Sequence, residues 1–128
     1  MYQWIEGNIN SQIVTLNSNN ITLNQNASEH FRDVKYVTVG IDYDSFELAI
    51  HPVTKSELER NTFTISQIHK LSHGNTYTRI SNKALCDHIS EFIDKELDGI
   101  KYSGHFDEKK KLFIINLKEP MMKGRSSL

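Results

Sequence analysis

The chain has 128 residues, 38% hydrophobic and 24% charged, so it is long enough for one compact domain but too short for a catalytic domain joined to a regulatory one. Fifteen Lys and Arg residues against 16 Asp and Glu residues give a formal net charge of -1, which excludes a uniformly basic nucleic-acid-binding protein but allows a local basic face. The single cysteine, Cys86, cannot form an internal disulfide, so we expect a reducing, cytoplasmic location. No apolar run approaches the roughly 20 residues that span a bilayer, and the first ten residues do not resemble a signal peptide, so we expect no membrane partner.

The N-terminal third predicts a hairpin followed by a short helix. Two β-prone runs, 13–16 and 21–23, flank an Asn-rich turn. In the segment 24–33, Asn26 and Glu29 have the spacing of a capping box, which predicts a helix of two to three turns. Asparagine is concentrated in this region, and its abundance has two open explanations, a preference for turns and caps or a low-GC genome.

A second hairpin is predicted from the alternating segments 36–43 and 46–52, which flank Asp44 and Ser45. The middle of the chain, 53–75, is less regular. Thr54 and Glu57 have the spacing to cap one helical turn, and the stripe formed by Ile65, Ile68 and Leu71 fits either a helix or a strand.

The C-terminal half predicts a strand, a helix and a third hairpin. The strand covers 76–80, and the hairpin joins 100–106 to 112–117 through a charged turn. Between them, 81–97 predicts an amphipathic helix that starts at Ser81 or Asn82 and ends just before Gly99. We expect residues 120–128 to form a disordered tail.

The order strand, helix, strand, turn, strand occurs in 21–53 and again in 76–117, which predicts a duplicated unit. We therefore predict an α+β fold in which two related strand-helix-hairpin modules pack with pseudo-twofold symmetry, with an N-terminal hairpin added. In this interpretation residues 1–119 form one domain, with module one at 13–53, a crossover at 54–75 and module two at 76–117.

The segments 20–31, 37–41 and 48–53, with 77–85 as a more divergent copy, resemble the swapped-hairpin module of AbrB-type and MraZ-type regulators. The chain is also similar in pattern to small uncharacterised proteins of Gram-positive bacteria and their mobile elements. The regulator resemblance implies DNA binding by a sheet-and-loop surface. The residues expected to contact DNA are Arg79, Lys83, Arg32 and Lys35.

The chain departs from the family pattern at the DNA-contacting positions of the first copy. The Gly-Arg, Pro and Arg of the family motif are replaced by Asn19-Asn20, by Asn24 and by Ser28-Glu29. Neutral amides supply little of the salt-dependent affinity that Lys and Arg provide, so the charge distribution argues against DNA binding.

The remaining clusters of His, Cys, Asp and Lys residues fit structural roles better than metal-binding or catalytic roles. His69 and His73 would share one face of a helix, but no third ligand follows at a suitable spacing and Gly74 interrupts the segment, so we predict no metal site. Cys86 borders an apolar stripe and is expected to be a buried, inert thiol. Asp42 and Asp44 are expected to serve a turn, and the cationic run 109–111 is expected to form a solvated turn, with a phosphate contact as the minority alternative.

The sequence therefore predicts a non-enzymatic protein without catalytic residues, cofactor or evident small-molecule substrate. No glycine-rich phosphate loop enters a helix. The leading interpretation is a DNA-binding transcriptional regulator. The alternative is a protein-interaction or structural module of unknown role, without DNA binding and of the kind that mobile elements encode, that forms a homo-oligomer or binds another protein.

Overall fold

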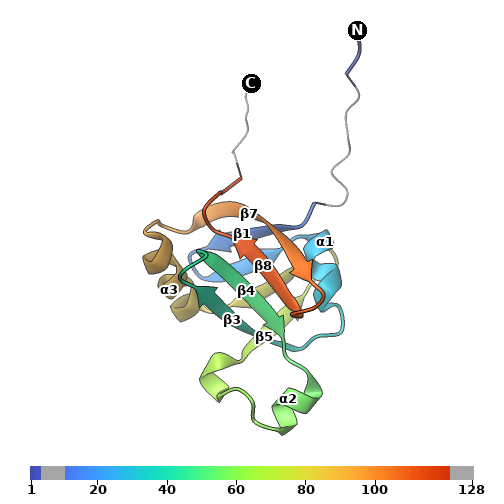
Figure 1. The fold of residues 1–128 in the computed structure, drawn as a ribbon, viewed down its shortest axis with the longest axis vertical. Helices are drawn as coiled ribbons and strands as arrows, with labels where there is room; N and C mark the ends of the chain where they lie inside the picture. The colour runs from blue at the N-terminus through green and yellow to red at the C-terminus, as the bar shows by residue number, and fades with distance from the viewer. Residues whose placement is uncertain (4–10, 122–128) are drawn as a thin grey trace.

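The alternating apolar and polar residues form strands in the computed structural model, which describes residues 1–3 and 11–121. The described residues form eight strands, which close into one antiparallel barrel in the order β1-β2-β6-β5-β3-β4-β8-β7 (Figure 1). The strands are β1 (Ile13–Asn17), β2 (Asn20–Leu23), β3 (Tyr36–Asp42), β4 (Glu47–Pro52), β5 (His69–His73), β6 (Thr78–Ser81), β7 (Asp98–Asp107) and β8 (Leu112–Asn116).

Short helices occupy the connections between the strands. The connection from β2 to β3 contains α1 (Gln25–Ser28) and η1 (Glu29–Phe31), and α3 (Lys83–Ile93) joins β6 to β7. The segment between β4 and β5 contains α2 (Lys55–Glu59) and η2 (Ile65–Gln67). Figure 1 shows α1 and α3 on opposite sides of the barrel, with the α2 segment projecting from one end.

The barrel interior is filled by the inward-facing residues of the strands and by the apolar sides of α1, η1 and α3. Burying this apolar surface is the main stabilising contribution, at roughly 25 cal/mol per Å². The largest side chains with less than 2% exposure are Tyr102, Phe31, Phe113, Leu16, Ile21, Leu23, Leu48, Ile50, Ile80, Ile89, Ile115 and Val14.

The three predicted hairpins are confirmed. β1 pairs with β2, β3 with β4, and β7 with β8, each in antiparallel register. The predicted capping of a helical turn by Thr54 is also confirmed, because Thr54 Oγ1 accepts the N–H of Glu57 at 3.1 Å and the Glu57 carboxylate accepts the N–H of Thr54 at 2.9 Å.

The predicted fold class is wrong. The α+β architecture of two separately packed strand-helix-hairpin modules would keep each module's strands together, whereas the strands of 13–53 and 76–117 are neighbours of each other around one barrel. β1 pairs with β7, β2 with β6, and β4 with β8. The fold does not correspond to the AbrB-like swapped-hairpin arrangement. The segment 54–75, predicted as a crossover, supplies β5 to the barrel.

Helix boundaries also differ from those predicted. Asn24, rather than Asn26, caps α1, with its Oδ1 accepting the N–H of Ala27 at 3.0 Å. The helix expected at 81–97 ends at Ile93, because Asp94 adopts a left-handed conformation (φ 57°). Gly99 (φ 93°) lies inside β7, where the register against β1 shifts, so it serves a β-bulge and not a helix end. Residues 122–128 of the expected disordered tail lie outside the described residues.

The barrel is closed weakly between β3 and β5. Their ladder contains two pairs, Tyr36 with Lys70 and Val37 with His69, although β3 continues to Asp42. On its other edge β3 pairs with β4 along its length from Val37 to Asp42. One edge of β3 therefore extends beyond its strand partner, on the side of the barrel that faces α3.

Candidate functional site: a groove between β3 and α3

The backbone of β3 presents unpaired polar groups beyond the β5 ladder. Tyr36 O accepts the N–H of Val53 at 2.9 Å and so faces the β4 side, while Lys35 O accepts the N–H of Leu71 at 2.9 Å and faces the β5 side. Peptide groups alternate in direction along a strand, so the N–H and C=O groups of Val39 and Ile41 point away from β4. Within residues 1–3 and 11–121 these groups have no backbone partner.

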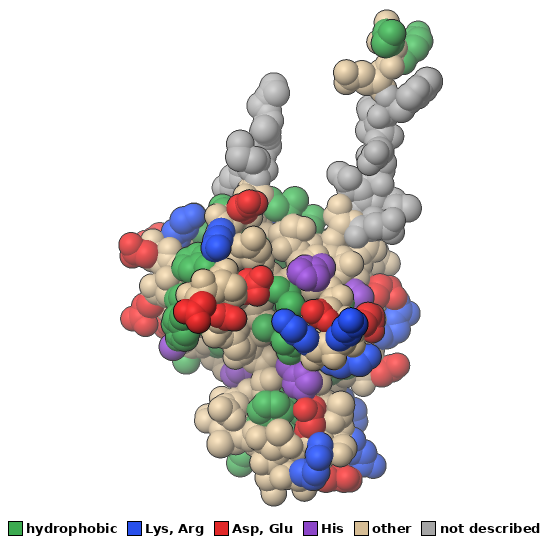
Figure 2. All heavy atoms as spheres, in the orientation of Figure 1, with side chains coloured by type: hydrophobic (Ala, Val, Ile, Leu, Met, Phe, Trp, Pro, Cys, Tyr) green, Lys and Arg blue, Asp and Glu red, His purple; other side chains and the backbone are tan. Residues whose placement is uncertain are grey.

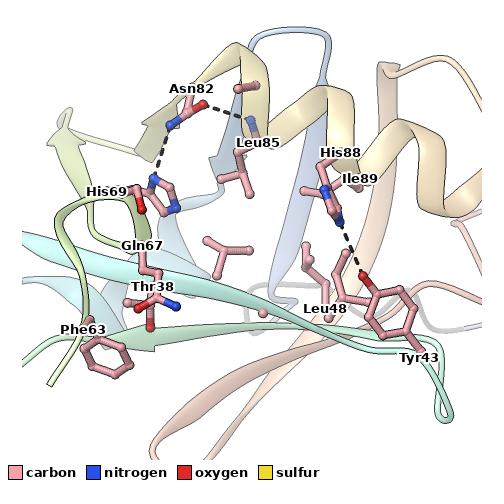
Figure 3. A pocket seen from close by; sticks show the side chains of 15 residues that line it. Thr38, Tyr43, Leu48, Phe63, Gln67, His69, Asn82, Leu85, His88 and Ile89 are labelled. Atoms are coloured by element: carbon pink, nitrogen blue, oxygen red, sulfur yellow. Dashed lines mark hydrogen bonds between the residues drawn. The ribbon is translucent and has the colours of Figure 1, made fainter.

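A groove of about 530 Å³ lies between this edge of β3 and helix α3. Its volume falls in the range typical of ligand pockets, roughly 300–1,000 Å³. Leu48 and Ile89, labelled in Figure 3, line the groove but are fully buried, so its accessible apolar surface comes from the partly buried Val39, Ile41 and Leu85. The groove is lined by Thr38, Val39, Gly40, Ile41, Tyr43, Leu48, Phe63, Ser66, Gln67, His69, Asn82, Ala84, Leu85, His88 and Ile89.

One end of the groove contains a polar pair whose hydrogen positions can be assigned. Asn82 Oδ1 accepts the N–H of Leu85 at 2.9 Å, so the opposite side-chain atom, Nδ2, is the amide donor, and it donates to His69 Nδ1 at 3.3 Å (Figure 3). His69 Nδ1 is therefore unprotonated, and Nε2 carries the ring proton. Burial lowers the pKa of His69 below its ordinary value of 6.5, which also favours the neutral ring. His69 offers the groove a neutral donor.

At the other end, Tyr43 and His88 face each other across the groove. Tyr43 Oη lies 3.4 Å from His88 Nε2, and the Tyr43 ring packs edge-on against Phe92 with a centroid separation of 5.1 Å. Tyr43 follows β3 directly, and His88 lies on α3. This contact joins the two walls of the groove where β3 ends.

The third wall comes from the segment between β4 and β5. Phe63, Ser66 and Gln67 line the groove from this side. Gln67 Oε1 accepts the N–H of Thr64 at 3.0 Å, so its amide nitrogen is the remaining donor of that side chain. The groove thus combines an apolar bottom, a ring of hydrogen-bonding side chains and a strand edge.

The four residues expected to contact DNA are not gathered in one hollow of the described structure. Arg32 pairs with Glu29, and Lys83 pairs with Asp87 at 3.1 Å. Arg79 lies on the outer side of β6, with its guanidinium carbon 4.7 Å from the centroid of the Tyr77 ring. Arg32 shares a hollow with Tyr77, whereas Lys35 lines a different hollow near α2. Figure 2 shows Lys and Arg side chains interspersed with Asp and Glu side chains on the face in view.

His69 and His73 lie at the two ends of strand β5, so they do not share a helical face. His73 Nε2 donates to Val34 O at 2.8 Å and its Nδ1 accepts from Thr78 Oγ1 at 3.2 Å, which satisfies a neutral ring. Among the described residues, no group of three or more His, Cys, Asp or Glu side chains is placed to hold a metal ion.

The expectations for the cysteine and the turn carboxylates are confirmed. Cys86 is 1% exposed, and burial together with the charge of Asp87 raises the pKa of its thiol. Asp42 accepts the N–H groups of Asp44 and Ser45 at 3.0 and 3.2 Å, and these hydrogen bonds lower its pKa. The cationic run 109–111 forms the corresponding turn of the β7–β8 hairpin, where Asp107 accepts the N–H groups of Lys109 and Lys110.

Sequence reasoning did not identify the groove. Val39 and Ile41 lie in a strand, as predicted. The groove exists because that strand, β3, extends beyond its ladder with β5. Strand length and ladder length are separate properties, and only the strand is visible as an alternating pattern. The polar pair of Asn82 and His69 joins residues 13 positions apart and was likewise not predicted.

No protein-family model matches the chain, and neither a curated protein nor a solved structure matches it. Within the described residues, no helix has both the length and the apolar character needed to cross a bilayer.

Proposed function

We propose that the protein is a protein-interaction module that binds an extended peptide segment of a partner protein in the groove between β3 and α3. The observation that carries this proposal is the unpaired edge of β3, where the N–H and C=O groups of Val39 and Ile41 face the groove. An extended peptide satisfies such groups by adding a strand to the sheet, a recognition mode in which backbone hydrogen bonds supply affinity and side-chain pockets supply specificity.

The side chains around the edge define the kind of peptide that fits. Successive residues of an added strand point to opposite sides, so alternate residues face the apolar surface of Val39, Ile41 and Leu85 while the others face outward. His69, Asn82 and Gln67 surround one end with polar groups suited to a hydrogen-bonding side chain. We therefore infer a partner segment of alternating apolar and polar residues.

An uncovered strand edge also needs an explanation in its own right. Exposed edges promote aggregation, and proteins usually protect them with charges, Pro or a covering element. The residues of β3 that face the groove, Val39 and Ile41, carry no charge, and they are partly buried against the core. A strand edge of this kind, screened by a helix across a groove, is suited to reversible pairing with a partner.

The DNA-binding interpretation gains no support from the arrangement of its four expected contact residues. Arg32 and Lys83 already have carboxylate partners, which reduces the cationic charge that each offers to phosphate. A heparin column at low salt provides the direct check. Retention that falls steeply with rising salt, and weakens in the Arg79→Ala/Lys83→Ala double variant, would favour DNA binding over peptide binding.

The proposal is tested by titrating isotope-labelled protein with a short peptide of alternating valine and threonine that has lysine at each end. We expect the amide resonances of Val39 and Ile41 to shift and their hydrogen exchange to slow, because these N–H groups become hydrogen-bonded. The amide of Gly40 faces β4, so its protection serves as the internal control. Shifts confined to the outer face of β6, with Val39 and Ile41 unchanged, would reject the groove as the binding site.

A pair of variants separates backbone recognition from side-chain recognition. Val39→Pro removes the N–H that faces the groove and leaves the ladder to β4 in place, so we expect peptide binding to be lost. Val39→Thr keeps both the N–H and a β-branched shape, so binding should persist. Circular dichroism establishes whether each variant remains folded, and sedimentation at several concentrations detects the alternative in which a second copy of the chain occupies the edge.

A further inference from the structure

The segment 53–68, which we call the flap, leaves the barrel after β4 and returns at β5. It contains α2 and η2 and projects from one end of the barrel in Figure 1. Phe63, Ser66 and Gln67 of the flap form one wall of the groove. The position of the flap therefore determines the width of the groove at this wall.

One histidine on the barrel holds the flap. His51, on the outer side of β4, places Nε2 2.9 Å from Glu57 Oε2 and 3.0 Å from Glu57 Oε1, and Glu57 belongs to α2 of the flap. His51 Nδ1 lies 3.1 Å from the backbone carbonyl oxygen of Lys111, in the turn between β7 and β8. The His51 ring also lies 5.8 Å from the ring of Phe63, centroid to centroid. One side chain thus connects the barrel, α2 and the wall of the groove.

The partners of His51 determine which of its contacts can form as hydrogen bonds. A backbone carbonyl oxygen can only accept a hydrogen bond, and so can an ionised carboxylate, whereas a neutral imidazole has one N–H to donate. Burial raises the pKa of Glu57, but hydrogen bonds from the Thr54 backbone and from His51 outweigh that effect and lower the pKa below its ordinary value. Glu57 is therefore ionised near neutral pH, and both contacts of His51 form as hydrogen bonds only when the ring carries two protons.

We propose that His51 and Glu57 form a proton-dependent clamp that positions the flap and thereby controls access to the groove. This inference rests on the proposed function for its consequence, but the clamp itself is a property of the fold. When His51 loses its second proton, one ring nitrogen presents a lone pair to either the Lys111 carbonyl or the Glu57 carboxylate. Repulsion at Glu57 breaks the attachment of the flap directly, whereas repulsion at Lys111 displaces the ring that holds Glu57, so in both cases the flap is held less tightly.

Other charged groups in the same hollow modulate the clamp. The ammonium group of Lys111 pairs with Glu108 at 3.5 Å. On the neighbouring strand β3, the residue opposite His51 is Thr38, which is uncharged. Both cations and carboxylates therefore face the ring of His51 from the elements packed around it. The charged groups around the hollow are Asp33, Lys35, Lys55, Glu57, Arg60 and Lys111.

His73 provides a matched contrast to His51. His73 also bonds a backbone carbonyl, that of Val34, but its second partner is the Thr78 hydroxyl, which can donate to the ring. Both contacts of His73 therefore persist when the ring is neutral. His51 differs because neither of its partners can donate.

The clamp is tested by hydrogen exchange of the flap amides at pH 6 and pH 8.5, corrected for the intrinsic pH dependence of exchange. We expect the protection of residues 54–68 to fall by roughly tenfold at the higher pH, the change in an opening equilibrium that one charge-assisted hydrogen bond supports. In His51→Gln this pH dependence should disappear, and in His73→Gln it should remain. Equal pH dependence in wild type and His51→Gln, or no pH dependence in wild type, would overturn the clamp.

A second variant tests the role of the carboxylate. Glu57→Gln keeps the capping box of α2, because Gln at that position also accepts the backbone N–H of Thr54. It also supplies an amide that can donate to a neutral ring, so the contact no longer requires the second proton and the pH dependence of flap protection should disappear. An unchanged pH dependence of flap protection in Glu57→Gln would exclude Glu57 as the partner that requires the second proton.

Peptide binding separates failure of the clamp from failure of the proposed function. If the valine–threonine peptide binds more weakly at pH 8.5 in wild type, and equally at both pH values in His51→Gln, the clamp controls the groove. Flap release without peptide binding at either pH would reject the proposed function and leave the clamp intact. Peptide binding that is unaffected by flap release would overturn the clamp's control of access.

Discussion

Asn82 connects helix α3 to strand β5 through His69. Its Oδ1 caps the first turn of α3 by accepting the N–H of Leu85 at 2.9 Å, and its Nδ2 donates to His69 Nδ1 at 3.3 Å. Because the capping oxygen fixes the orientation of the amide, the helix cap also sets the tautomer of a groove histidine. The same residue therefore stabilises α3 and defines the polar end of the groove.

Substitutions at Asn82 should separate these two roles. We expect Asn82→Ala to lower the free energy of unfolding by about 1 kcal/mol through loss of the cap, with a further loss from the His69 contact. Asn82→Ser retains a capping oxygen but lacks the amide donor, so its destabilisation should be smaller. Urea denaturation measures both variants. Equal destabilisation by Ala and Ser would show that the helix cap contributes little.

The contact between Asn82 and His69 also predicts a change in the tautomer of His69, which unfolding measurements do not detect. In Asn82→Ser the ring is no longer held with Nδ1 as acceptor, so both neutral tautomers become populated. Nitrogen-15 chemical shifts of the imidazole distinguish the tautomers. A wild-type ring with its proton on Nδ1 would contradict the assigned hydrogen bond.

His69 should make the folded state less stable in acid. Burial lowers its pKa below the ordinary value of 6.5, so the unfolded chain binds the proton more readily than the folded protein. The contribution of neutral His69 is fully present above about pH 6.5, and it is lost as the pH falls through the lowered pKa of the folded state. Comparing the unfolding free energies of wild type and His69→Gln across pH 4.5 to 7.5 isolates this contribution, and a difference that grows toward acid with wild type the more stable would contradict it.

Two glycines in strands should respond oppositely to alanine. A Cβ on Gly40 would meet no atom within 4 Å, so Gly40→Ala should stabilise the protein by about 0.5 kcal/mol through reduced entropy of the unfolded chain. A Cβ on Gly104 would lie 2.5 Å from Phe113 Cε2 and 3.2 Å from the Ile114 carbonyl oxygen, so Gly104→Ala should cost about 1–3 kcal/mol. Thermal unfolding of the two variants tests the pair, and similar effects at both sites would be inconsistent with the packing around β7.

Tyr102 should tolerate the loss of its hydroxyl. The side chain is fully buried, and its Oη has no hydrogen-bond partner among the residues that the structure describes. A buried hydroxyl without a partner carries a desolvation cost, so Tyr102→Phe should raise the free energy of unfolding by up to about 1 kcal/mol. Chemical denaturation provides the measurement, with Phe113→Leu as a control that removes core volume. A clear loss of stability in Tyr102→Phe would indicate that the hydroxyl is hydrogen-bonded in solution.

The local elements of this protein follow from its sequence. The three hairpins were predicted because each alternating pair of segments is joined by a short turn, and Asp42, Ser45 and Asp107 form the turn contacts expected of such residues. The capping of α2 by Thr54 and Glu57 was also readable, since both partners lie within one helical turn. These features depend on residues a few positions apart.

The barrel and its groove depend on pairings that the sequence does not mark. Every strand edge offers the same backbone N–H and C=O groups, so alternation shows which face of a strand is buried and not which strand lies beside it. The ladders of β1 with β7 and of β4 with β8 join the N-terminal half of the chain to its C-terminal half, and they interleave segments that were predicted to form separate modules.

The candidate site also depends on pairings between distant segments of the chain. Its strand edge exists because β3 pairs with β5 at only two positions, and its polar groups come from three connections that meet only in the folded barrel. The sequence by itself determined the three hairpins, their turns and the capping of α2, because those rest on local geometry. Only the tertiary structure decided the closure of the barrel, the free edge of β3 and the contact of His51 with Lys111, because each requires contacts between residues that chain connectivity does not bring together.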